Sequence, residues 1–585
     1  RPRRSSRRYI ATRKRGRILT TASDAAYQQT AAALDGLLAL QNASAAVAKY
    51  TNAFTIPFLL ASHYFNRLES ERVWSRTPAE NWSTYLKLGT MNVDLAGRAL
   101  SAGLEAARHF FEKEIEPASP CLVNGDCGPV YDLNHRMAAL MNRLVHEFPQ
   151  AIDAVEDEFG FHFERQPASS KIDETDRFIL YQVLPTDPAV EPATDGKPLL
   201  IIPPFVLGAN ILSFLPGDRR SYAHAFANQG IPTYVRVLKD IAAHEAVQGM
   251  MPEDDALDNH RFCSRLAARH DAPVTLNGYC QGGYTALCDL LSGKLDDVVD
   301  ALITCVAPMD GTRSRGLTQF LKTLPKAFND LAYGTKMLPS GIRVADGTLM
   351  GWIYKLKSIE TESPLLALWR DMMLLGHSDE DGQPAPINKT AAALNYWLTY
   401  ERSDLPMGIT EMSYASYNIP ISATGTLPIT MFGRELNLHR IKERKVPWQI
   451  CYGLNDDLVE PETALAPLDF IDVETAPFPK GHVAIATSWS HPTSKYALHT
   501  RFNDGKARGP VRFQLDLQDE LLASRKPAAK APKQTAVSSR SGAKTPPVGR
   551  GKASNAHPPK KAPGKSKARA SRKRAAGKAV TEKTP

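Results

Sequence analysis

The chain has 585 residues, more than the roughly 100 to 200 of a single domain, so we expect two or three units with tails. Apolar residues make up 43% and charged residues 23%, as in soluble globular proteins, and no uninterrupted apolar run approaches the roughly 18 residues that would span a bilayer. The seven scattered cysteines exclude a regular disulfide framework and favour a reducing cytoplasm.

Charge is concentrated at the two ends of the chain. Residues 1–17 hold nine Arg or Lys and no acid, and residues 525–585 hold eighteen against one acid, Glu582. These segments carry +9 and +17, so the +9 of the whole chain leaves −17 for residues 18–524. The Lys, Ala, Pro and Ser composition predicts a disordered basic segment at 1–20 and a disordered tail at 525–585, since neither can bury an apolar core. No apolar run follows the basic start, so a secretory signal is not predicted.

The first long region is rich in Ala, Leu, Glu and Arg at helical spacing, which predicts a helical N-terminal region over 21–170. A stretch containing Pro and Cys at 116–132 interrupts it, as a loop between helices would. Cys121 and Cys127 lie in this loop and could be paired or bind a metal, but no second ligand pair follows at a useful spacing, so we expect neither role.

From residue 178 short apolar runs alternate with segments of helical length, which predicts an α/β fold with a mostly parallel sheet over 171–515. The predicted strands lie in FILYQVLP, KPLLIIPPFV, IPTYVRVL, APVTLNGYC, DALITCVAPMD and VPWQICYGLNDD. Between about 311 and 440 the strands give way to segments that look largely helical, as in a cap inserted over a sheet.

The stretch NGYCQGGYTALC (277–288) has the pattern of a nucleophile elbow with cysteine in the place of serine. Small residues two positions before and after Cys280 relieve crowding at a strained strand-to-helix turn, and the following helix points its N-terminus at the sulfur. We therefore predict that Cys280 is a nucleophile. Three other cysteines lie within apolar runs and are expected to be buried core residues: Cys288, Cys305 and Cys451.

A nucleophile elbow predicts that an acid and then a histidine follow in chain order. NDDLVEP after a late apolar run offers Asp456 or Asp457, and PKGHVA after the next run offers His482. The spacing to the following aliphatic pair favours Asp456, whereas counting from the flanking Gly and Pro favours Asp457. Four other histidines have no such context: His146, His162, His244 and His260.

These segments resemble the polyhydroxyalkanoate synthases, α/β-hydrolase-fold enzymes that polymerise hydroxyacyl-CoA thioesters through a cysteine. The resemblance covers roughly 180–500 and lies in GYCQGGYTALC, LLIIPPFV, VAPMD, NDDLVEP and GHVA. It implies a Cys280, His482 and Asp456 triad, with an oxyanion held by the backbone N–H of Gln281 and by one near Phe205 or Val206. The basic tail has no counterpart in that family and resembles the tails of histone-like and granule-associated proteins.

Three functions follow as hypotheses. The first is a 3-hydroxyacyl-CoA polymerase or acyltransferase, the second a thioesterase or polyester hydrolase, and the third a non-enzymatic tether of granules or nucleoid with a vestigial triad. The CoA thioester would be a substrate, and no cofactor or metal is expected. The expected partners are a polyester granule surface, nucleic acid or another polyanion at the tail, and a second copy in a homodimer. We expect a cytoplasmic protein, with association to granules or nucleoid.

Overall fold

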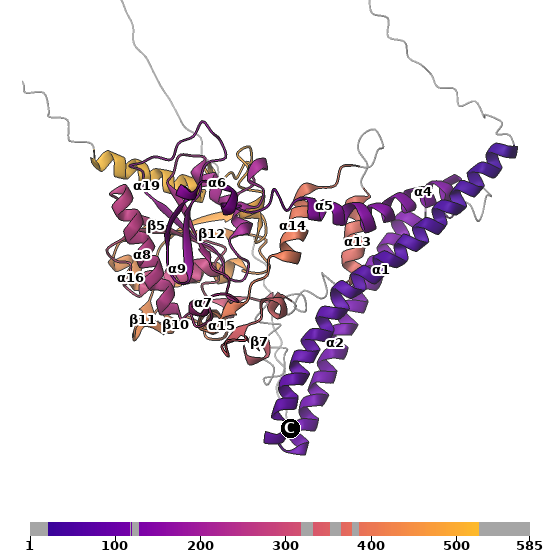
Figure 1. Ribbon diagram of the computed structural model, residues 1–585, viewed down its shortest axis with the longest axis horizontal. Helices are drawn as coiled ribbons and strands as arrows, with labels where there is room; N and C mark the ends of the chain where they lie inside the picture. Colours follow the sequence, from indigo (N-terminus) through magenta and orange to yellow (C-terminus); the bar gives the residue numbers. More distant parts are fainter. Residues whose placement is uncertain are drawn as a thin grey trace, which may run out of the picture. The chain divides into compact units, whose positions relative to one another are not determined.

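The computed structural model describes residues 22–116, 119, 128–316, 331–351, 364–376 and 385–525 (Figure 1). The expectations for the basic segment 1–20, for Cys121 and Cys127, and for the tail from residue 526 onward lie outside the described residues. Parts of the predicted cap, 317–330, 352–363 and 377–384, also lie outside them.

An eight-stranded sheet forms the centre of the catalytic region, in the order β1-β2-β4-β3-β5-β6-β12-β13. Its strands are β1 Lys171–Glu174, β2 Phe178–Gln182, β3 Leu199–Ile202, β4 Thr233–Leu238, β5 Val274–Tyr279, β6 Val299–Cys305, β12 Trp448–Gly453 and β13 Glu474–Phe478. β2 runs antiparallel to β1 and β4, and every pairing from β4 to β13 is parallel. This mixed sheet with one early antiparallel strand is the α/β-hydrolase fold, so the predicted fold class is confirmed.

Helices cover both faces of the sheet, and the central strands β3 and β5 are accordingly buried on both sides. One apolar core lies beneath α8 (Pro252–His270), α9 (Gln281–Leu291) and α16 (His439–Glu443). The other lies beneath α6 (Tyr222–Ala227), α18 (Ala484–Thr487) and α19 (Pro510–Arg525). The two layers hold the carboxyl ends of β5, β12 and β13 at one edge of the sheet, with β6 between β5 and β12, and the predicted functional residues lie at this edge.

The region between β6 and β12 contains strands as well as the predicted helices. Among its described residues the α-helices are α13 (Pro364–Leu375), α14 (Lys389–Tyr400), α15 (Met407–Asn418) and α16. Its strands are β7 (Thr335–Met337), β8 (Arg343–Ala345), β9 (Leu405–Pro406), β10 (Thr426–Met431) and β11 (Arg434–Asn437). β10 and β11 form a hairpin whose turn residues, Phe432 and Gly433, both have positive φ, at 51° and 68°. The prediction of a largely helical insertion is therefore incomplete.

The described residues of the N-terminal region up to residue 154 are mostly helical, with α1 (Ala22–Arg72), α2 (Pro78–Phe110), α4 (Gly128–Asn142) and α5 (Phe148–Ala154). α2 begins with a capping box, in which Thr77 and Glu80 satisfy each other's backbone N–H groups. Two single π-helical turns, Phe111–Ile115 and Arg143–Glu147, continue α2 and α4.

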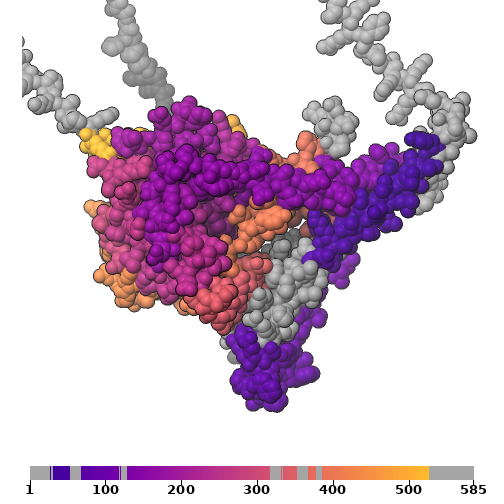
Figure 2. Space-filling model, in the orientation of Figure 1, coloured from indigo at the N-terminus to yellow at the C-terminus, as the bar shows by residue number. Residues whose placement is uncertain are grey.

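The N-terminal helices pack against helices of the cap. Phe110 stacks on Trp369 of α13 with ring centroids 4.5 Å apart, and Arg143 donates to the Leu375 carbonyl at 2.8 Å. α5 contacts α14, where the purple and orange side chains meet in Figure 2. The cap and the N-terminal region therefore share one apolar core.

One helical stretch among the described residues, Thr30–Asn52 in α1, is long and apolar enough by composition to cross a membrane, with a mean hydropathy of 1.2. The sequence analysis expected no such segment because Asp35 and Lys49 interrupt the apolar run, but the surrounding Ala and Leu keep the average high. Core helices of soluble proteins meet the same criterion, but only 11% of this stretch is buried: Ala46 is enclosed, whereas Leu37 and Leu40 are exposed. The composition alone does not place α1 in a bilayer.

Candidate active site

Cys280 lies at a sharp turn between β5 and α9, as the elbow pattern predicts. Its backbone adopts φ 51° and ψ −124°, a conformation that costs free energy for any residue with a side chain. Two hydrogen bonds hold this turn: the Cys280 N–H donates to the Cys305 carbonyl at 2.8 Å, and the Gly283 N–H donates to the Cys280 carbonyl at 2.9 Å. The strained turn is therefore fixed by its neighbours, with α9 starting directly behind the sulfur.

The glycines around Cys280 are required by close backbone approach. A Cβ at Gly278 would lie 2.3 Å from the Gly283 Cα, and one at Gly282 would lie 2.2 Å from the Ile202 carbonyl oxygen. A Cβ at Gly283 would lie 2.6 Å from the Ala307 side chain. Any larger residue would push β3 or β6 away from α9, so the spacing of the motif follows from the packing of the elbow.

The acid and histidine segments bring their side chains together at the carboxyl ends of β12 and β13. His482 Nδ1 lies 2.8 Å from Asp456 Oδ2, and both side chains are buried. Asp456 Oδ1 accepts the backbone N–H groups of Leu458 at 3.0 Å and Val459 at 2.8 Å. Asp457 is exposed. Of the two aspartates that the sequence left open, the geometry selects Asp456 as the partner of His482.

Cys280 and His482 form an enclosed pair, each only 8% exposed. His482 Nε2, on the side of the ring away from Asp456, is buried and makes no hydrogen bond of ordinary geometry. The Cys280 sulfur nevertheless lies close enough to act on the ring by its charge. Hydrogen bonds between catalytic groups are often loose before substrate binds, so this nitrogen can still accept the thiol proton.

The ionisation of His482 reflects these neighbours. Burial of the imidazole would lower its pKa, but the negative charges of Cys280 and Asp456 and the hydrogen bond to Asp456 outweigh burial and raise the pKa to about 10. At neutral pH the ring therefore holds a proton.

Replacing Cys280 with serine should lower the pKa of His482, because a neutral hydroxyl supplies no negative charge at neutral pH whereas burial of the ring is unchanged. A pH titration of the ¹⁵N-labelled histidine rings by NMR measures this directly. In the wild-type protein His482 should keep its proton beyond pH 9, and in Cys280→Ser it should lose the proton at lower pH. An identical midpoint in both proteins would contradict the assigned charge interaction.

Tyr279, the residue before the nucleophile, anchors the histidine loop. Its hydroxyl donates to the His482 carbonyl at 3.0 Å, and its ring meets the imidazole edge-on with centroids 6.4 Å apart. The sequence analysis did not single out Tyr279, since nothing in its local pattern reveals a contact with a segment about 200 residues away.

The predicted oxyanion donors lie at the start of α9 and in the loop after β3. Gln281 is the first residue of α9, so its N–H has no partner within the helix. The close approach of Gly282 to the Ile202 and Pro203 carbonyls holds the β3 loop against this helix end. The Val206 N–H faces the same place, where it donates to the Gln281 side-chain oxygen at 3.3 Å.

The other residues considered from the sequence lie outside this site. Cys288, Cys305 and Cys451 are fully buried, as expected of core residues. His162, His244 and His260 make local contacts with Glu164, the Asp240 carbonyl and Asp297, and His146 lies in the π-helical turn after α4. Among the described residues no cluster of three His, Cys, Asp or Glu side chains is arranged to hold a metal.

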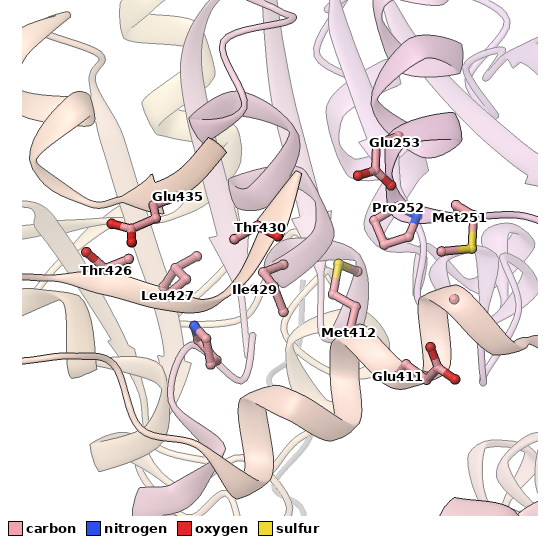
Figure 3. A pocket seen from close by; sticks show the side chains of 12 residues that line it. Met251, Pro252, Glu253, Glu411, Met412, Thr426, Leu427, Ile429, Thr430 and Glu435 are labelled. Atoms are coloured by element: carbon pink, nitrogen blue, oxygen red, sulfur yellow. The ribbon is translucent and has the colours of Figure 1, made fainter. Parts of the chain in front are cut away.

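A surface pocket of about 450 Å³ lies between α8, α15 and the β10–β11 hairpin (Figure 3). Glu253, Glu411 and Glu435 come to it from three different elements, and Met251 and Met412 line its apolar part. None of the candidate catalytic residues lines it, so it is separate from the site at Cys280.

The fold and the site together define the class: the chain is an α/β-hydrolase-fold protein with a cysteine at the turn between β5 and α9 and a hydrogen-bonded histidine and aspartate after β13 and β12. The sequence matches no protein-family model and no curated protein.

Solved structures with similarity to the chain include esterases and a thioesterase. A carboxylesterase of the thaumarchaeon Nitrososphaera gargenis shares 12% identity, with a TM-score of 0.30 over 54% of this chain and 91% of that one. A lipase-esterase related protein of Clostridium acetobutylicum shares 13%, with a TM-score of 0.30 over 54% and 95%. The thioesterase domain of the curacin biosynthetic pathway shares 13%, with a TM-score of 0.27 over 55% and 95%. The fold assignment itself rests on the strand order and the elbow.

Proposed function

We propose that the chain is a cysteine acyltransferase resembling the polyhydroxyalkanoate synthases. It would take a 3-hydroxyacyl group from a CoA thioester onto Cys280, release CoA, and pass the group to the hydroxyl of another hydroxyacyl unit. The observation that carries the proposal is a cysteine, in place of serine, at a strained elbow next to His482. A thiolate exchanges one thioester for another at little free-energy cost and leaves an acyl-enzyme that still reacts with a hydroxyl.

In the first step the Cys280 sulfur attacks the thioester carbonyl while His482 holds the proton. The tetrahedral oxyanion would be stabilised by the N–H groups of Gln281 and Val206. When the carbon–sulfur bond to CoA breaks, His482 can give its proton to the departing thiolate. This step leaves an acyl thioester on Cys280 and free CoA.

In the second step His482 acts as a base. Because His482 gave its proton to the departing CoA thiolate, the ring is now neutral and Nε2 can accept a proton. Asp456 keeps Nδ1 protonated, which leaves Nε2 as the acceptor. The incoming 3-hydroxyl loses its proton to Nε2, attacks the acyl carbonyl, and forms an ester as the bond to Cys280 breaks.

The same residues could hydrolyse the acyl-enzyme if water reached it. The low exposure of Cys280 and His482 supports transfer over hydrolysis, because a site with little contact with solvent limits competition by water. The assembled geometry also argues against a purely structural role, since a vestigial site has no need to keep its histidine buried beside a carboxylate.

The deciding experiment is incubation of the full chain with 3-hydroxybutyryl-CoA while CoA release is followed. Release of CoA with a growing polyester supports the proposal. Release of CoA with free 3-hydroxybutyrate identifies a thioesterase, and no release above the rate without protein refutes acyl transfer from this substrate class.

We also propose that the basic tail binds nucleic acid by charge alone, because its eighteen basic residues are accompanied by no aromatic residue that could stack on bases. With about six phosphate contacts, affinity for duplex DNA should fall roughly 1000-fold between 50 and 200 mM salt. Truncation after Arg525 should remove this binding and leave CoA release unchanged.

The truncation point follows from the structure, since Arg525 ends α19 and donates to the carbonyls of Asp195 and His270 at 2.8 and 3.2 Å. Gel-shift titrations of both proteins at the two salt concentrations measure the effect. Equal, weak binding by the full and truncated chains would show that the tail does not anchor nucleic acid.

A further inference from the structure

The side chain of Gln281 engages one of the two donors of the proposed oxyanion hole. Its Oε1 accepts the Val206 N–H at 3.3 Å, and its Nε2 donates to Ser413 Oγ of α15 at 2.8 Å. The orientation of the amide follows from chemistry, because a backbone N–H needs an oxygen as its partner. One side chain thus joins the β3 loop, the nucleophile helix and the cap.

The helix that carries Ser413 is firmly held. Ser413 Oγ donates to the Ile409 carbonyl at 3.2 Å, and Ile409 and Met412 are buried in the core of the α/β region. A Cβ at Gly408 would lie 2.7 Å from the Met250 carbonyl oxygen, so the start of α15 already touches the backbone before α8. The part free to move is therefore the Gln281 amide and not the helix.

A substrate carbonyl and the Gln281 amide compete for the same donor. Both present an oxygen to the Val206 N–H, and one N–H does not serve two acceptors with good geometry. Gln281 is only 8% exposed, so its amide has little access to water and stays with its protein partners. The substrate must therefore displace Gln281 Oε1 before the second oxyanion donor becomes available.

We propose that the Gln281 side chain is a latch that keeps the oxyanion hole closed until an acyl carbonyl displaces it, and that Ser413 sets how firmly the latch is held. The inference rests on the proposed acyl transfer through Cys280. It makes the Gln281 side chain and Ser413 positioning groups that act on the Val206 donor, in addition to the backbone role of Gln281.

The test uses Gln281→Met, which keeps the length and volume of the side chain but cannot accept the Val206 N–H. Without substrate, hydrogen exchange of the Val206 amide should be faster in this variant than in the wild-type chain. With 3-hydroxybutyryl-CoA, single-turnover acylation of Cys280 should be about three- to tenfold faster in this variant. The substrate then no longer has to break the hydrogen bond between the Val206 N–H and the Gln281 side chain, and one ordinary hydrogen bond has an effect of this size.

Ser413→Ala should give a smaller change in the same direction in both measurements. Because Ser413 acts only through Gln281, the double variant should behave like Gln281→Met alone. Thr410→Ala is the matched control: this hydroxyl lies on the same helix and donates to the Pro406 carbonyl at 2.9 Å, so its loss should not change Val206 exchange.

Two results would overturn the latch. The first is equal Val206 exchange in the wild-type chain and in both Gln281→Met and Ser413→Ala. The second is slower acylation of Cys280 in Gln281→Met, with the rate losses of the two single variants adding up in the double variant. That result would mean that the Gln281 amide supports the structure of the site and does not close it. If the wild-type chain is never acylated, the proposed function fails, whereas the exchange comparison still decides whether Gln281 closes the Val206 donor. If Gln281→Met does not fold, faster exchange in Ser413→Ala decides it.

Discussion

Replacement of Cys280 with alanine is expected to abolish acyl-enzyme formation and to lower CoA release by about 10⁵-fold or more, because loss of a nucleophile removes the covalent route altogether. The elbow offers no substitute, since Cys280 is the residue that the strained turn places beside His482. Intact-protein and peptide mass spectrometry after exposure to 3-hydroxybutyryl-CoA measures the adduct, and a thiol reagent measures released CoA.

Cys288→Ala is the matched control, as this cysteine lies two turns further along α9. It is fully buried, and burial raises the pKa of its thiol, so it stays protonated and unreactive. Its replacement should cost about 1 kcal/mol of stability through packing and leave the adduct in place. An acyl group found on a cysteine other than Cys280 would contradict the elbow assignment.

The sheet could be predicted because its strands are short, almost continuously apolar runs separated by helical segments. Leu199–Ile202 is fully buried, as its sequence LLII indicates; Val274–Tyr279 is buried as well, although its sequence VTLNGY includes Thr275 and Asn277. The β10–β11 hairpin is harder to predict: TLPITM alternates in polarity and Phe432-Gly433 forms a tight turn, but the segment is short and lies among sequences of helical character.

Contacts between distant segments could not be predicted from local pattern. The stacking of Phe110 on Trp369 joins residues more than 250 positions apart, and the local sequence of neither segment predicts the contact. The same limit applies at the site: chain order pointed to His482, whereas the bond from Gln281 to Ser413 depends on how the cap folds over α9. The motif specifies the chemistry, and tertiary packing specifies what surrounds it.

The two neighbouring aspartates are expected to differ sharply. Asp456→Asn should lower turnover by about 10⁴-fold, the cost of holding a catalytic histidine in the wrong tautomer. Asp457→Asn, a matched change at the adjacent exposed position, should cost less than about threefold, as surface substitutions usually do. Steady-state CoA release from 3-hydroxybutyryl-CoA by the two purified variants measures the difference.

The hydrogen bonds of Asp456 explain why an isosteric change should be so damaging. The Leu458 and Val459 N–H groups both donate to Oδ1, so an asparagine must place its oxygen there and turn its NH₂ toward His482 Nδ1. Nδ1 would then have to accept, which puts the ring proton on Nε2 and removes the base from the side facing Cys280. Normal folding with a large loss of turnover is therefore expected for Asp456→Asn, and the reverse ranking of the two variants would move the acid to Asp457.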